Sequence, residues 1–108
     1  MQKVKISAGR ALFRCPGCGD LHQVAVDTPF ENGARWNWNG SLTEPTFTPS
    51  ILVTYSANPS AEEEFKEWRT ERRCHSFVTN GHIQFLSDCT HQLAGQTVDL
   101  PDYEVTSC

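Results

Sequence analysis

The motif CPGCG, residues 15–19, is the feature that most constrains the fold of this chain. A Pro/Gly turn between two cysteines brings their sulfurs to one point, which is the geometry that tetrahedral zinc prefers. The chain has 108 residues, so its core is modest and a bound metal would add stability. Its first residues lack a secretory apolar region, so we expect a cytoplasmic protein, where cysteines bind metal more often than they form disulfides.

Alternating residues predict a strand on each side of this motif, over residues 11–14 and 21–26. The two cysteines therefore lie at the tip of a hairpin, and no βαβ pattern of a redox dithiol surrounds them. Within the second strand, His22 shares a face with Val24. We nevertheless expect His22, like His82, to lie on a strand surface rather than to bind the ion.

A second hairpin is predicted over residues 74–79 and 82–86, because the dipeptide Asn80-Gly81 between them is a strong two-residue turn signal. Counting back from this turn places Cys74 and His75 on opposite faces of their strand. Both can therefore face one ion only where the backbone is irregular, at the point where the strand begins.

One helix is predicted, over residues 61–72, with Ala61, Phe65 and Trp68 on a single face that should dock on the sheet. The fold class that follows is mostly β with one helix (α+β). We expect a small antiparallel sheet of hairpins joined by a zinc knuckle. Residues 1–108 are expected to form a single zinc-binding domain.

A second pair of cysteine or histidine ligands is needed to close the metal site. The sequence offers Cys74 with His75, and Cys89 with His91. Cys89 also fits the core, because free cysteine is among the most buried residue types. The spacing alone leaves these alternatives open.

Three stretches, FRCPGCG, PTFTPSI and CHSFVTNGHIQF, occur in this order between residues 11 and 86. In this pattern the chain resembles a bacterial and phage family of small zinc-binding domains of unknown function. Some members occur in phages and prophages, and others lie beside prokaryotic ubiquitin-like conjugation genes.

The resemblance implies a Zn²⁺ ion held by four residues: Cys15, Cys18, Cys74 and His75. In the family pattern, the later cysteine and histidine are spaced more widely than they are in this chain. The adjacency of Cys74 and His75 therefore leaves Cys89 and His91 as reserve ligands.

The net charge of −4 argues against a nucleic-acid partner, because phosphate contacts need clustered cations. No apolar run is long enough to span a membrane. We therefore expect a zinc-stabilised phage or prophage accessory protein, in the host cytoplasm if phage-encoded, that acts by binding another protein. A basic host factor is one candidate partner, and Trp36 and Trp38 are the candidate binding surface.

The alternative function is a small metal-dependent hydrolase in which Asp88 and His91 together act as the general base. Signatures of Ser/His/Asp catalysis, nucleophilic cysteine and HExxH are absent from the sequence. A chain of this length is also expected to leave little room for a deep pocket. Catalysis is therefore the less expected of the two functions.

Overall fold

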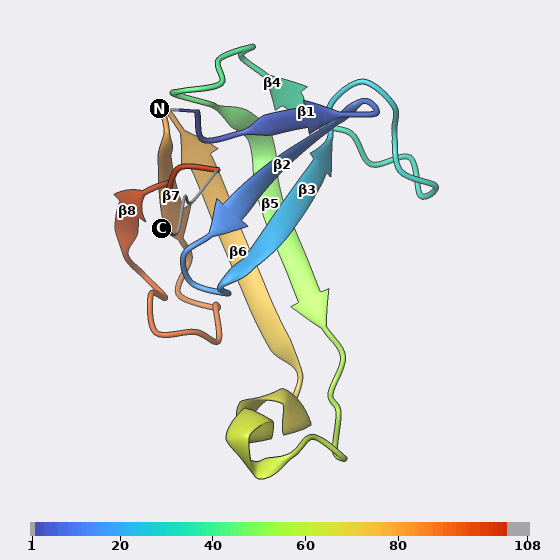
Figure 1. Ribbon diagram of the computed structural model, residues 1–108, viewed down its shortest axis with the longest axis vertical. Coiled ribbons are helices and arrows are strands. Elements are labelled where there is room, and N and C mark those ends of the chain that lie inside the picture. The colour runs from blue at the N-terminus through green and yellow to red at the C-terminus, as the bar shows by residue number, and fades with distance from the viewer. Residues whose placement is uncertain (1, 104–108) are drawn as a thin grey trace, which may run out of the picture.

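The computed structural model describes residues 2–103 and arranges them as two antiparallel sheets (Figure 1). The smaller sheet has the strand order β1-β2-β3, with bounds Lys5–Ser7, Arg10–Cys15 and Asp20–Ala25. The larger sheet has the order β4-β5-β6-β7-β8, with bounds Asn37–Trp38, Phe47–Tyr55, Arg72–Thr79, His82–Phe85 and Thr97–Asp99. The predicted class, mostly β with one helix, is confirmed, although the strands form two sheets rather than one.

Both predicted hairpins are present. β2 and β3 pair up to Cys15 opposite Asp20, so the cysteine motif occupies the hairpin tip. β6 and β7 pair Thr79 with His82 across the turn at residues 80–81. Asn80 and Gly81 both have positive φ, at 49° and 80°, as the tight hairpin turn requires.

The core lies between the two sheets. Phe13 of β2 stacks on Phe47 of β5 with ring centroids 6.1 Å apart. Alternation along β6 buries every second residue, with Cys74, Ser76 and Val78 facing the core. The opposite face of the larger sheet remains exposed, and this is the face to which His75 belongs.

The helix differs from its prediction. It is a short 3₁₀ helix, η1, over Glu63–Arg69, with non-helical φ and ψ at Phe65 and no buried residue. Figure 1 shows it beyond the ends of β5 and β6, away from both sheets. Phe65 and Trp68 stack on each other at 4.4 Å, and the guanidinium of Arg72, at the start of β6, lies 5.2 Å from the centre of the Trp68 ring. No helix among residues 2–103 is long and apolar enough to cross a membrane.

Candidate active site and metal centre

A cluster of potential metal ligands joins the two sheets. Cys15 at the end of β2, Cys18 in the turn, His22 on β3 and Cys74 on β6 offer ligand atoms that all lie within 4.8 Å of one another. The Sγ atoms of Cys15 and Cys74 are 3.8 Å apart. A tetrahedron with Zn–S distances near 2.3 Å has an edge of about 3.8 Å, so the cluster could hold a metal ion.

The pKa values of these residues are strongly linked, because their side chains lie in contact with one another. Hydrogen bonds from Cys15 and Cys74 lower the pKa of the Cys18 thiol, whereas hydrogen bonds to Cys15 and Cys18, together with burial, raise that of Cys74. Burial opposes protonation of His22, but its interactions with the Cys15 and Cys18 sulfurs together outweigh burial and raise its pKa to about 9. His22 is 3% exposed, and its Nε2 atom, although buried, has no hydrogen-bond partner. An orphaned imidazole nitrogen beside three sulfurs fits a metal ligand.

The structure therefore brings three of the four implied ligands together, namely Cys15, Cys18 and Cys74, but with His22 in the fourth place. The expectation that His22 lies on a strand surface is wrong. His22 shares its face of β3 with Val24, which is buried. An apolar residue two positions along the strand was the sequence signal that His22 faces the core. His75 points to the opposite face of β6, since neighbours in a strand alternate.

The two reserve ligands lie close to the cluster without completing it. Cys89 and His91 form a second group with Cys74, again within 4.8 Å. His91 packs edge-on against Phe85 at 4.4 Å and accepts the N–H of Leu93 at Nδ1. Metal binding by either residue stays a prediction.

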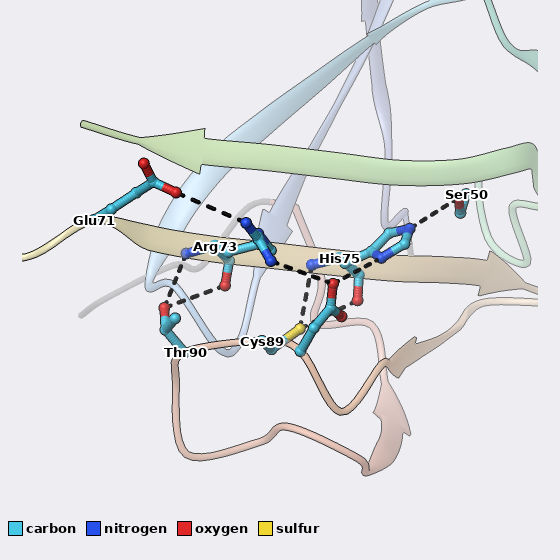
Figure 2. A network of polar contacts seen from close by, with 7 residues as sticks. Ser50, Glu71, Arg73, His75, Cys89 and Thr90 are labelled. Atoms are coloured by element: carbon cyan, nitrogen blue, oxygen red, sulfur yellow. Dashed lines mark hydrogen bonds and ion pairs between the residues drawn. The ribbon is translucent and has the colours of Figure 1, made fainter. Parts of the chain in front are cut away.

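His75 instead lies at the centre of a chain of polar contacts on the exposed face of the larger sheet (Figure 2). Its Nε2 atom is 3.1 Å from Ser50 Oγ, and its Nδ1 atom is 3.2 Å from Asp88 Oδ2. With a proton on Nδ1 donated to the carboxylate, Nε2 is free to accept the hydroxyl proton of Ser50. This order of hydroxyl, imidazole and carboxylate is the Ser-His-Asp arrangement of nucleophilic catalysis.

The bulge of β5 positions Ser50. The pairing of β5 with β6 shifts register between Phe47 and Ile51, so the segment carrying Ser50 is not held in a regular ladder. The indole N–H of Trp36 donates to the carbonyl of Ser50 at 3.1 Å, which holds this segment in place. The other two residues of the Ser-His-Asp arrangement lie on different elements: His75 on β6 and Asp88 in the turn after β7.

Sequence reasoning missed Ser50. The segment around it contains two prolines, and no nucleophile motif surrounds it. The only signal was its position directly before the apolar strand residues that follow, in the stretch PTFTPSI. Sequence motifs of Ser/His/Asp catalysis are indeed absent, yet the fold assembles Ser50, His75 and Asp88.

The other predicted site residues lie as follows. Trp36 and Trp38 are half-buried, and the indole of Trp38 donates to the carbonyl of Ser41; a binding role for either stays a prediction. Asp88 contacts His75 and does not pair with His91 as a general base. The Nδ1 atom of His91 instead accepts the N–H of Leu93.

A pocket is present despite the modest size of the chain. A cavity of about 320 Å³ lies between the cysteine turn and η1, lined among others by Gly17, Tyr55, Trp68 and Arg72. The expectation of little room for a pocket was therefore wrong. Ser50, His75 and Asp88 do not line this cavity, and the side chains of His75 and Asp88 are 26% and 41% exposed.

Comparison with known proteins identifies one family. The model of the family described as "Bacterial ubiquitination-like system serine protease (BubE)" matches residues 1–86. No curated protein and no solved structure matches the chain. The family match contradicts the expected function of a phage accessory protein that acts by binding another protein. It lends no support to a metal-dependent hydrolase built on Asp88 and His91 either.

Proposed function

This chain belongs to the family of bacterial ubiquitination-like system serine proteases (BubE), and we propose that it is a peptidase with Ser50 as nucleophile. One observation carries the proposal, namely the unbroken hydrogen-bonded chain from Ser50 through His75 to Asp88, with links of 3.1 and 3.2 Å. Both distances are within reach for proton transfer.

In this mechanism, His75 Nε2 takes the hydroxyl proton of Ser50 while Oγ attacks the carbonyl carbon of a peptide bond. The resulting tetrahedral species collapses as His75 returns the proton to the leaving amine, and an acyl-enzyme ester remains on Ser50. A water molecule then attacks the ester with His75 again as base, which releases the acid and restores the hydroxyl. Asp88 holds the imidazole in the productive tautomer and stabilises its positive charge.

Arg73 supports the carboxylate. Its guanidinium lies 4.0 Å from Asp88 and 3.8 Å from Glu71, so Asp88 sits between an imidazole and a cation. The Asp88 side chain is 41% exposed, so this ion pair is solvent-screened and contributes little to stability. Its effect is on the orientation of the carboxylate.

The exposure of the site favours a protein substrate. The His75 side chain is 26% exposed, and two apolar side chains share its face: Leu52, 54% exposed and paired with His75 across the strands, and Phe77, 39% exposed. An extended segment of a folded protein can lie across such a face, whereas a small ligand would find no enclosure there. With the family name, this supports a ubiquitin-like protein, or a conjugate of one, as the substrate.

We further propose that the metal is zinc and that its role is structural. Cys15, Cys18, His22 and Cys74 supply four ligands of the types that zinc prefers, which leaves no open position for a reacting water. When bound, zinc would link the β2–β3 hairpin to β6. His75 is the next residue of β6 after Cys74, so the metal would brace the strand that carries the base.

The test is covalent labelling with a fluorophosphonate probe, followed by peptide mapping. We expect the label on Ser50, with its rate reduced by about 10⁴-fold or more in His75→Ala. Ser87→Ala is the matched control, because Ser87 is exposed and adjacent to Asp88 but outside the hydrogen-bonded chain. Equal labelling of the native protein and Ser50→Ala would refute the assignment.

A further inference from the structure

The turn that carries Asp88 is attached to β6 through side chains rather than through a regular ladder. β7 ends at Phe85, and the N–H of Leu86 still donates to the carbonyl of His75 at 2.9 Å. In a regular antiparallel pair, the carbonyl of Leu86 would accept the N–H of His75 in return. Here that carbonyl accepts the N–H of Cys89 at 3.2 Å, which closes the turn around Asp88.

The thiol of Cys89 takes the place of the lost ladder partner. Its Sγ accepts the N–H of His75 and donates to the carbonyl of the same residue, both at 3.2 Å (Figure 2). Cys89 is 8% exposed, so these contacts are shielded from water. One side chain therefore binds both backbone groups of His75.

Thr90 binds the backbone of Arg73 in the same way, two residues before His75 on β6. Its Oγ1 accepts the N–H of Arg73 at 2.9 Å and donates to the carbonyl of Arg73 at 3.2 Å, while its own N–H donates to that carbonyl at 2.9 Å. Arg73 is the residue whose guanidinium approaches Asp88. The two side chains thus hold the far end of the turn against the two β6 residues that face the carboxylate.

We propose that Cys89 and Thr90 are positioning residues of the triad, which fix Asp88 at hydrogen-bonding distance from His75. This inference rests on the proposed function. The turn after β7 has no ladder of its own beyond Leu86, so without these side chains only two backbone bonds to β6 remain, from Leu86 and Thr90. A misplacement of about 1 Å at a catalytic group can cost about a hundredfold in rate.

The first test compares Thr90→Val with Thr90→Ser in the metal-loaded full chain. Valine keeps the shape of threonine but lacks the hydroxyl group, whereas serine keeps the hydroxyl group. We expect Thr90→Val to lower kcat by about ten- to a hundredfold with KM unchanged, and Thr90→Ser to restore it. The low-field proton NMR signal of His75 Nδ1–H, which reports its bond to Asp88, should shift or broaden only in the valine variant.

The second test uses Cys89→Ala with metal content as an added measurement. We expect a similar loss of kcat with full metal content. Loss of the metal would assign Cys89 to the metal centre and overturn its positioning role. The proposal also fails if the valine and serine variants of Thr90 have equal kcat, or if the NMR signal is unchanged in Thr90→Val.

These outcomes are distinguishable from failure of the proposed function. If Ser50→Ala retains activity, the nucleophile is misassigned and kcat no longer reports on this site. The NMR signal still does, because it depends only on the bond between His75 and Asp88.

Discussion

Substitution of His22 and of His75 should have different effects, the first on metal binding and the second on catalysis. His22 faces the sulfurs between the sheets, whereas His75 faces solvent beside Ser50. We therefore expect His22→Ala to lose the metal and most of the stability, and His75→Ala to keep the metal and lose activity.

The magnitudes follow from what each ring touches. Structural zinc contributes about 10 kcal/mol or more in small folds, and a domain of this size is stable by only about 5–15 kcal/mol. His22 is 3% exposed and packs edge-on against Phe13 at 5.7 Å, so its truncation also opens a cavity that costs roughly 2–5 kcal/mol. His75 makes two hydrogen bonds near the surface, whose loss costs about 1–3 kcal/mol.

The assay combines zinc per chain by elemental analysis, the urea midpoint of unfolding, and the rate of fluorophosphonate labelling. His82→Ala is the control, because His82 lies on the same sheet as His75 and makes an exposed contact with Asp99 at 3.0 Å; it should change none of the three measurements. If His75→Ala releases the metal while His22→Ala retains it, the division of roles between the two histidines is wrong.

Three further predictions concern the open face. Asp88→Asn should lower kcat by about 10²–10⁴-fold with an unchanged urea midpoint, because the amide carries no charge and can donate to Nδ1, which holds the base in the wrong tautomer; an unaltered kcat would exclude Asp88 from the triad. Leu52→Ser and Phe77→Ser should raise KM for a protein substrate while leaving labelling by a small fluorophosphonate unchanged, and an equal loss of labelling would contradict a role in substrate contact. Trp36→Phe should reduce kcat and the labelling rate alike, since it removes the hydrogen bond to the Ser50 carbonyl; full activity would show that the bulge holds Ser50 without it.

Local patterns predicted the hairpins well. The dipeptide at residues 80–81 sets the register of β6 and β7, and alternation then decides which side each residue faces. The same count placed Cys74 and His75 on opposite faces, which is what the structure has. The ligand set implied by resemblance paired them on one ion, and the alternation of the strand argues against that pairing.

Pairings between distant segments could not be read from the sequence. Ser50 meets His75 only because β5 pairs with β6 through a bulge, and no local signal reports that register. His22 reaches Cys74 only because the two sheets pack face to face. The helix prediction failed for a related reason: an apolar face docks only where the topology brings a sheet to it, and η1 lies beyond the strand ends.

One strand links the two sites, and this yields a prediction about the metal. Cys74 faces the cluster and His75 faces the exposed side of β6, so under the proposed structural role of the metal, its removal should abolish activity by disturbing the strand that carries His75. Exchange of zinc for Co²⁺ separates the two roles. A structural ion with four protein ligands should allow the Co²⁺ form to keep the same kcat and the same labelling rate at Ser50. A kcat that changes with the metal while Ser50 labelling stays constant would place the metal in the chemical step and overturn the structural assignment.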